Sequence, residues 1–243
     1  MGRIFITGST DGLGRAAAES LLASGHEVVV HARHAGRLAA VRDLLDRGAM
    51  GVVGDLSDLE QTRDVAEQVN RLGPVGAVIH NAGVFRGPQI LQVNVVAPYV
   101  LTALIPRPRR LIYLSSGMHR SGHASLSGID WAAPGQSVSY SDSKLYITAF
   151  AAYLARHWPD VLSNAVAPGW VPTKMGGPGA PDDLRLGHLT QAWLAASDDP
   201  EALTSGGYWH HQRRAKAHPA VNDPKFQDEL VDHLARATGE RLG

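Results

Sequence analysis

Short apolar segments alternate along the chain with longer segments in which apolar residues recur every three or four positions. The short segments predict strands at Ile4–Thr7, Glu27–Ala32, Met50–Val53, Val75–His80, Arg110–Ser115, Val161–Ala167 and Tyr208–Trp209. The longer segments predict helices at Leu13–Ser24, Leu38–Arg47, Leu59–Leu72, Gln92–Leu104, Ser141–Arg156, Leu184–Ala196 and Lys225–Ala237. Strands rich in Val and Ile, without polar alternation, are typical of parallel sheets covered on both faces. The pattern predicts an α/β fold: a doubly wound, Rossmann-type parallel sheet of about seven strands flanked by helices on both faces.

A length of 243 residues and a hydrophobic content of 44% suffice for one α/β domain with a sizeable core. No internal repeat or linker-like stretch divides the chain, and a Gly- and Pro-rich segment from Gly176 to Pro181 indicates a mobile loop. We therefore expect a single domain over residues 1–243, with substrate loop elements around residues 117–139 and 170–183.

The composition excludes several function classes. The 23 basic residues balance the 23 acidic ones, so no net field attracts nucleic acid or an anionic membrane. The absence of cysteine excludes disulfides, thiolate catalysis and cysteine metal sites. A strand segment begins at Ile4, which leaves no room for a signal peptide, and no apolar run reaches the roughly 20 residues that span a bilayer. We expect a cytoplasmic protein with no membrane span and no nucleic-acid partner.

A glycine-rich turn joins the first predicted strand to the first predicted helix. It consists of Thr7, Gly8, Ser9, Thr10, Asp11, Gly12, Leu13 and Gly14. Glycines let the backbone turn tightly and approach a pyrophosphate, and the helix N-terminus adds free N–H groups and a positive dipole end. The spacing departs from the commonest Rossmann fingerprint, and a purely structural turn would use the same glycines. The position between strand and helix favours dinucleotide binding.

The end of the second predicted strand bears on the choice of cofactor. An NAD(H) site usually has an acidic residue here, and Ala32 cannot take that role. Arg33 can form charge-assisted bonds to a 2′-phosphate, although a solvated surface arginine, as expected for Arg37, is the alternative. NADP(H) is therefore favoured over NAD(H). Asp55 is placed to accept a hydrogen bond from the adenine amino group or, alternatively, to cap a helix.

Tyr140 and Lys144 stand one helical turn apart, on the same face of a predicted helix. Ser116 follows one predicted strand, Asn81 follows another and Pro168 a third, and such strand ends converge on one crevice of an open parallel sheet. An ammonium about 4–5 Å away can lower the pKa of a phenol toward neutrality. We expect Tyr140, acidified by Lys144, to exchange a proton with a carbonyl oxygen that Ser116 orients.

These residues together resemble those of the short-chain dehydrogenase/reductase family, in its compact single-domain branch. The matching positions are Thr7-Gly8-x3-Gly12-x-Gly14, Asp55, Asn81-Ala82-Gly83, Asn94, Ser116, Tyr140-x3-Lys144 and Pro168-Gly169-Trp170-Val171-x-Thr173. The resemblance implies that Ser116, Tyr140, Lys144 and Asn94 form the catalytic set, with Asn94 holding a water that relays protons through Lys144.

The same resemblance extends the cofactor site beyond the glycine turn. Lys144 would also bond the nicotinamide ribose, and Val171 and Thr173 would contact the carboxamide. The cofactor-binding set therefore comprises the turn residues from Thr7 to Gly14 together with Arg33, Asp55, Leu56, Asn81, Ala82, Gly83, Tyr140, Lys144, Pro168, Gly169, Val171 and Thr173. Family members with Ala-Arg at the position of Ala32 and Arg33 tend to use NADP(H).

The chain departs from the family pattern at several places. Asp11 stands where many NADP(H) users carry a basic residue, which weakens the phosphate clamp. The stretch between Asn81 and Asn94 is short, so a homo-oligomer built on the family's common dimer interface is an open question. The insert from Gly117 to Ser139, and the tail from Gly206 to Gly239, resemble retinol dehydrogenases and their bacterial relatives. The resemblance points to a lipophilic carbonyl or alcohol substrate, and a surface elaboration is the alternative.

The alternatives to the oxidoreductase are a metal site, a non-catalytic sensor, and an epimerase or dehydratase that uses the same cofactor, although the last usually belongs to longer relatives with an added substrate region. Metal binding would need a ligand cluster, but His119 and His123 lie in a predicted loop, and adjacent His210 and His211 would point to opposite faces of a strand. We expect no metal site. A non-catalytic NADP(H)-binding sensor on the same fold is the main alternative, although such a protein has no need of the complete set of Ser116, Tyr140 and Lys144.

Overall fold

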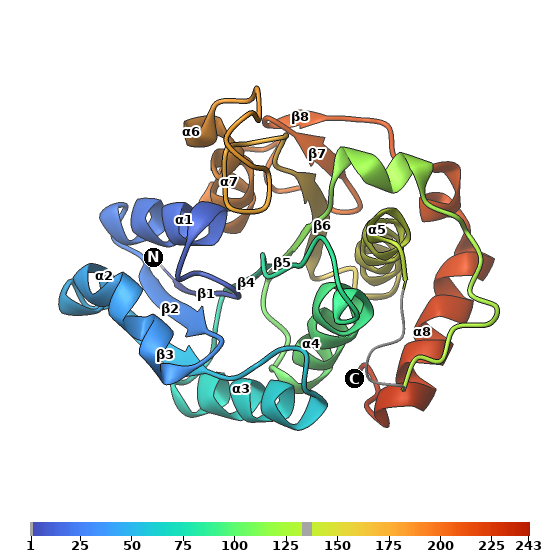
Figure 1. Ribbon diagram of the computed structural model, residues 1–243, viewed down its shortest axis with the longest axis horizontal. Coiled ribbons are helices and arrows are strands. Elements are labelled where there is room, and N and C mark those ends of the chain that lie inside the picture. The colour runs from blue at the N-terminus through green and yellow to red at the C-terminus, as the bar shows by residue number, and fades with distance from the viewer. Residues whose placement is uncertain (1, 133–137) are drawn as a thin grey trace.

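Residues 2–132 and 138–243 are described by the computed structural model, and they contain an eight-stranded sheet in the order β3-β2-β1-β4-β5-β6-β7-β8 (Figure 1). The strands are β1 Arg3–Ile6, β2 Glu27–Ala32, β3 Met50–Val53, β4 Ala77–His80, β5 Arg110–Leu114, β6 Leu162–Ala167, β7 Tyr208–His210 and β8 Arg213–Arg214. All neighbouring strands pair in parallel except β8, which runs antiparallel to β7. The predicted fold class is confirmed.

The helices lie on both faces of the sheet (Figure 1). The α-helices are α1 Gly12–Ala23, α2 Arg42–Asp46, α3 Leu59–Arg71, α4 Ala97–Leu104, α5 Tyr140–His157, α6 Leu184–Gly187, α7 Leu189–Ala196 and α8 Pro224–Thr238. Helices α1 and α7 bury their apolar residues against one face of the sheet, and α3, α4 and α5 do so against the other. Helix α8 packs on the outer side of α5.

Three predicted elements differ from the structure. The segment Leu38–Arg47 is not one helix but a 3₁₀ helix, Ala35–Val41, followed by the short α2, because only Val41 and Leu44 of these residues are buried. The predicted helix Leu184–Ala196 is interrupted at His188, which separates α6 from α7. The predicted helix from Gln92 begins with a π-helical turn, Gln92–Val96, before α4.

The strand order places a crevice at the carboxyl end of the sheet. From β1 the chain moves outward to β2 and β3 and then returns to β4 on the other side of β1. The loops after β1 and β4 therefore leave the sheet in opposite directions, and a cleft opens between them in folds of this kind. Among the described residues, no helix is both long and apolar enough to cross a bilayer.

Candidate active site

A cleft of about 400 Å³ lies at the carboxyl ends of the parallel strands. Predicted site residues that line it are Gly8, Thr10, Asp11, Gly12, Leu13, Arg33, Asp55, Leu56, Asn81, Ala82, Gly83, Tyr140, Lys144, Pro168 and Thr173. Residues that sequence reasoning did not assign to the site also line it: His31, Arg37, Ser57, Val84, Gln89, Val93, Leu114, Ser115, Lys174 and Met175. The fold thus gathers residues from across most of the chain around one opening.

The glycine turn is held in a shape that suits a dinucleotide. Gly8 and Gly12 have φ angles of +61° and +52°, which favour glycine, and a side chain on Gly8 would lie 3.0 Å from the Cα atom of Ala82. The Asn81 side chain donates hydrogen bonds to the carbonyls of Thr7 (2.9 Å) and Gly8 (3.1 Å). The turn leads directly into the N-terminus of α1, so bare backbone and helix dipole both face the cleft. These features fit a bound pyrophosphate.

Thr7 and Ser9 are buried beneath the turn and do not line the cleft. The Thr7 hydroxyl accepts a hydrogen bond from the Ala82 N–H (3.0 Å). The Ser9 hydroxyl donates to the Ile6 carbonyl (2.8 Å) and accepts from the His31 N–H (2.8 Å). Both residues therefore shape the turn from below.

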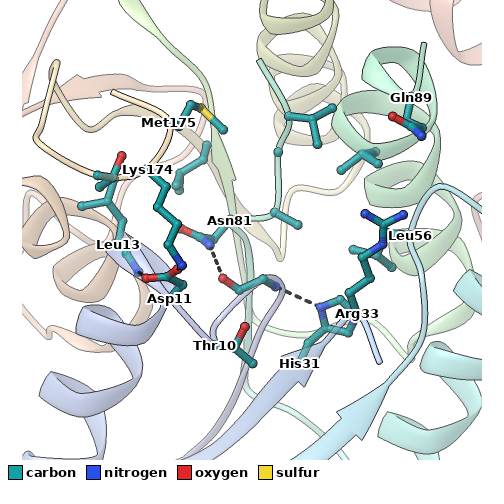
Figure 2. Close-up of a pocket in the computed structure, with 18 of the residues that line it drawn as sticks. Thr10, Asp11, Leu13, His31, Arg33, Leu56, Asn81, Gln89, Lys174 and Met175 are labelled. Carbon is teal, nitrogen blue, oxygen red and sulfur yellow. Dashed lines mark hydrogen bonds and ion pairs between the residues drawn. The ribbon is translucent and has the colours of Figure 1, made fainter. Parts of the chain in front are cut away.

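His31 braces the same turn from β2. Its Nδ1 accepts a hydrogen bond from the Gly8 N–H (3.0 Å; Figure 2). The ring proton is therefore on Nε2, which donates to the Gly54 carbonyl (2.8 Å). Burial lowers the pKa of His31, although the hydrogen bond to Gly54 opposes this. A neutral histidine is what the Gly8 hydrogen bond requires. No residue pattern along β2 indicates this contact, which only the pairing of strands creates.

Basic residues gather at the end of the cleft beside β2. The Arg33 guanidinium lies 2.7 Å from the Asp55 carboxylate, while 64% of the Arg33 side chain is exposed. Burial raises the pKa of Asp55, but hydrogen bonds from Ser57 and Arg33 outweigh burial and keep that pKa below its usual value. Asp55 is thus already paired to Arg33, a contact that the sequence did not predict. Arg37, expected on the solvated surface, instead lines the cleft and donates to the Thr10 hydroxyl (3.4 Å).

The Asp11 carboxylate lies close to two basic side chains, Lys174 and Arg37, and both line the cleft. This carboxylate caps α1 by accepting from the Gly12 N–H (2.8 Å), pairs with Lys174 and lies 3.6 Å from Arg37 (Figure 2). The hydrogen bond from Lys174 is the main reason that the pKa of Asp11 is lowered. Asp11 was expected to weaken the positive charge near the turn. The positive charges of Arg37 and Lys174 offset the negative charge of its carboxylate.

Tyr140 is the first residue of α5 and Lys144 lies one turn further along it, and Ser139 caps the helix by accepting from the Asp142 N–H (3.0 Å). Ser116 adjoins Tyr140 and lowers its pKa through a side-chain hydrogen bond, and the Lys144 Nζ atom lies 5.5 Å from the centre of the Tyr140 ring. Lys144 is 4% exposed, and its ammonium donates to the Leu114 carbonyl (2.7 Å). Of the predicted trio, Tyr140 and Lys144 line the cleft, while Ser116 adjoins Tyr140 without lining the cleft itself.

The protonation states differ from the sequence-based expectation. Burial raises the pKa of Tyr140, and the Ser116 hydrogen bond only partly opposes it, so the net shift is upward instead of the expected downward one. Burial also lowers the pKa of Lys144 to about 8. The physical reason is desolvation of both side chains, which the helical spacing alone does not reveal.

Asn94 lies in the π-helical turn beside Lys144 and is 1% exposed. Its carboxamide accepts from the Val84 N–H (2.8 Å) and donates to the Val84 carbonyl (3.0 Å) and the Ser143 hydroxyl (3.0 Å). The Asn94 side chain therefore ties the loop after β4 to α5. A role in holding a water stays a prediction.

The loop after β6 contributes Pro168, Thr173, Lys174 and Met175 to the lining of the cleft. Gly169 has a φ angle of +89°, and Thr173 lines the cleft while Val171 is buried outside it. Trp170, which is 61% exposed, donates from its indole to the Gly176 carbonyl (2.8 Å) and from its backbone to Asp182 (2.6 Å). Within the other predicted substrate element, residues 133–137 lie outside the described residues.

The histidine pairs take positions that the sequence only partly predicted. His210 ends β7, but His211 lies in the following turn with a φ angle of +48°, and the two rings stack with centroids 3.9 Å apart. The expectation that they point to opposite faces is wrong because the strand ends between them. In residues 2–132 and 138–243, no three His, Cys, Asp or Glu side chains are grouped as a metal site.

The family model described as short chain dehydrogenase matches residues 3–105. An uncharacterized oxidoreductase of Emericella nidulans is 39% identical over 98% of this chain and 98% of its own. A Streptomyces protein provisionally named daunorubicin C-13 ketoreductase DnrU is 30% identical over 98% of this chain and 92% of its own. The chain thus belongs to the short-chain dehydrogenase/reductase family, NAD(P)-dependent enzymes that act on alcohol and carbonyl groups.

Solved structures share the fold. An uncharacterized protein of Mycobacterium paratuberculosis superposes with a TM-score of 0.81 at 22% identity, covering 100% of this chain and 95% of its own. Pseudomonas aeruginosa RhlG, in an NADP active-site complex, superposes with a TM-score of 0.71 at 21% identity, covering 86% of this chain and 94% of its own. The predicted family is confirmed, and the likeness of the insert and tail to retinol dehydrogenases stays a prediction.

Proposed function

We propose that this chain is an NADP(H)-dependent oxidoreductase of a lipophilic carbonyl/alcohol pair, with Tyr140 as the general acid and base. One observation carries the proposal: Tyr140 lines the same cleft as a dinucleotide-type glycine turn. Ser116 forms a side-chain hydrogen bond with Tyr140, and the Lys144 Nζ atom lies 5.5 Å from the Tyr140 ring centre. When bound, the nicotinamide supplies or accepts the hydride. The protein's own residues hold the cofactor, orient the carbonyl oxygen and move the proton.

The proton chemistry follows from the environment of each group. Because burial raises its pKa, Tyr140 is protonated at neutral pH and can donate to a carbonyl oxygen. The Ser116 hydroxyl orients the same oxygen, and the Lys144 ammonium stabilises the phenolate that remains after proton donation. The reverse reaction returns the proton to Tyr140.

The lowered pKa of Lys144 leads to a prediction for the pH profile. Lys144 is protonated below its pKa of about 8 and neutral above it, whereas the raised pKa keeps Tyr140 protonated over the same range. We expect kcat for carbonyl reduction to fall as the pH rises through about 8, approaching about tenfold per pH unit. Turnover at saturating NADPH tests this. A profile that stays level to about pH 10 would contradict it.

The cofactor preference for NADP(H) is supported by two arginines. Arg33 and Arg37 both line the cleft beside β2, where the adenosine ribose of a dinucleotide lies in this fold. RhlG, which shares the fold, was solved with NADP. Guanidinium groups bind phosphate oxygens in paired, charge-assisted hydrogen bonds, so both side chains suit a 2′-phosphate.

Removing either arginine is expected to reduce selectivity for NADPH. Each hydrogen bond to a charged group is worth about 1.5–3 kcal/mol, so Arg33→Ala or Arg37→Ala should weaken NADPH binding by about 10- to 150-fold while NADH binding changes little. Titration of cofactor fluorescence measures both. Arg42→Ala is the control, since its side chain is 80% exposed and pairs with Asp46 on α2. Unchanged NADPH affinity in both variants would contradict the preference.

The substrate class is supported by exposed apolar side chains near the reacting groups. Phe85 packs edge-on against the Tyr140 ring with centroids 4.8 Å apart. Met118 follows Ser116 by two residues, and Met175 lines the cleft, and both are more than one-third exposed. The related Streptomyces protein is named as a ketoreductase, an enzyme of a carbonyl substrate. These features suit a lipophilic carbonyl compound.

The proposed function is tested by following NADPH oxidation with a panel of ketones, aldehydes and quinones, with NADH in parallel. We expect turnover with apolar carbonyl compounds and faster turnover with NADPH. NADPH binding without turnover on any member of the panel would instead support the non-catalytic sensor.

A further inference from the structure

We propose that His119 is a positioning residue that acts through Ser116 and makes the segment at residues 216–219 part of the catalytic apparatus. The inference rests on the proposed function, because it concerns the serine that orients the substrate oxygen. From the sequence alone, His119 was a candidate only for metal binding. It lies on the 3₁₀ turn Gly117–Ser121, which starts directly after Ser116.

Both ring nitrogens of His119 are used, and their roles are determined by the partners. The His218 backbone N–H donates to Nε2 over 3.0 Å, so Nε2 carries no proton. The proton is therefore on Nδ1, which lies 2.7 Å from the Ser116 carbonyl and donates to it. His119 thus connects the backbone of the serine to a segment almost 100 residues further along the chain.

The surroundings hold the ring in this orientation. His119 is completely buried, and its ring packs against Tyr208 of β7 with centroids 4.4 Å apart. The next residue, Arg120, donates to the Lys216 carbonyl over 3.0 Å and lies over the Tyr208 ring. Two consecutive side chains therefore attach the serine turn to the C-terminal segment. Rotation of the His119 ring would break both of its hydrogen bonds.

The hydrogen bond from His119 to the Ser116 carbonyl affects the Ser116 hydroxyl because it restrains the backbone of that serine. The Ser116 carbonyl accepts from the His119 backbone N–H (3.1 Å) as well as from Nδ1, and the hydroxyl accepts from the Met118 N–H (3.2 Å). With carbonyl and side chain both tied, the hydroxyl is directed to Tyr140. Small errors in the position of such a group weaken transition-state stabilisation more than substrate binding.

Two substitutions separate the two ends of the link. An asparagine amide nitrogen lies one bond from Cγ, as Nδ1 does, so His119→Asn can still donate to Ser116. The amide oxygen of glutamine lies two bonds from Cγ, as Nε2 does, so His119→Gln can still accept from the His218 N–H but no longer donates to Ser116. We expect His119→Gln to lower kcat by about tenfold and His119→Asn by less than about threefold, with KM and NADPH affinity unchanged in both. His123→Asn, on an exposed side chain of the same segment, is the control.

A double-mutant cycle tests whether His119 acts through Ser116. If it does, His119→Gln should have little effect on kcat in a Ser116→Ala background, while Ser116→Ala alone lowers kcat. Independent effects in the cycle, or equal losses in the Asn and Gln variants that follow their thermal stability, would show that His119 only packs the turn. These outcomes differ from failure of the proposed function, in which the unmodified protein itself turns over no carbonyl compound.

Discussion

Tyr140→Phe is expected to lower kcat for carbonyl reduction by about 10²–10⁴-fold, the range typical for loss of a general acid. The substitution removes only the hydroxyl, which is the proton donor and the partner of Ser116. The ring remains and still packs against Phe85, so the wall of the cleft keeps its shape. NADPH affinity should therefore change little. Single-turnover rates with bound NADPH, together with cofactor titration, measure the two quantities separately.

Tyr153→Phe provides the matched control on the same helix. Tyr153 stacks on His157 at the other end of α5, away from the cleft. We expect its loss of a hydroxyl to leave turnover unchanged. If Tyr140→Phe retained the activity of the unmodified protein, another group would have to supply the proton, and the assignment of Tyr140 would be wrong.

Gly14→Ala is expected to weaken NADPH binding by about 10- to 100-fold, although alanine is the better helix former. A Cβ atom at Gly14 would lie 2.6 Å from the Gly8 carbonyl oxygen and would overlap the Asn81 amide. That amide holds the carbonyls of Thr7 and Gly8, so the turn must open or the helix must shift. Overpacking of this kind costs about 1–3 kcal/mol. Isothermal titration with NADPH and thermal unfolding measure the two effects.

Gly76→Ala is the control for adding a methyl group at a glycine. Its Cβ atom would lie 3.7 Å from the Arg3 carbonyl, an ordinary contact, and it does not line the cleft. We expect cofactor binding to be unchanged. Equal NADPH affinity in Gly14→Ala and the unmodified protein would show that the turn has more room than the structure indicates.

Local sequence patterns were enough for most of the fold. The positions of β2 and β3 match the prediction residue for residue, because their apolar runs are bounded by Gly and polar residues. The short β8 was missed, since a two-residue strand has no pattern of its own and exists only by pairing with β7. The break at His188 was missed because the apolar spacing continues across it.

In the candidate site, too, local features could be predicted from the sequence, whereas contacts between distant segments could not. The glycine turn and the spacing of Tyr140 and Lys144 are local features, and the chain alone made them recognisable. Arg37 was assigned to the surface, but it lies on the 3₁₀ helix Ala35–Val41, which begins two residues after Arg33, and it lines the cleft. Its nearness to Arg33 in the sequence was the one signal that could have indicated this. Lys174 and His31 had no such signal, because their partners, Asp11 and Gly8, are distant in sequence.

By itself, the sequence determined the succession of most strands and helices along the chain, the glycine turn and the side chains proposed to react, since each depends on residues within a few positions of one another. Tertiary structure alone decided the protonation of Tyr140 and Lys144, the positive charges around Asp11, and the link from Ser116 through His119 to His218. Burial and hydrogen bonding set these properties, and both depend on which distant segments the fold brings together.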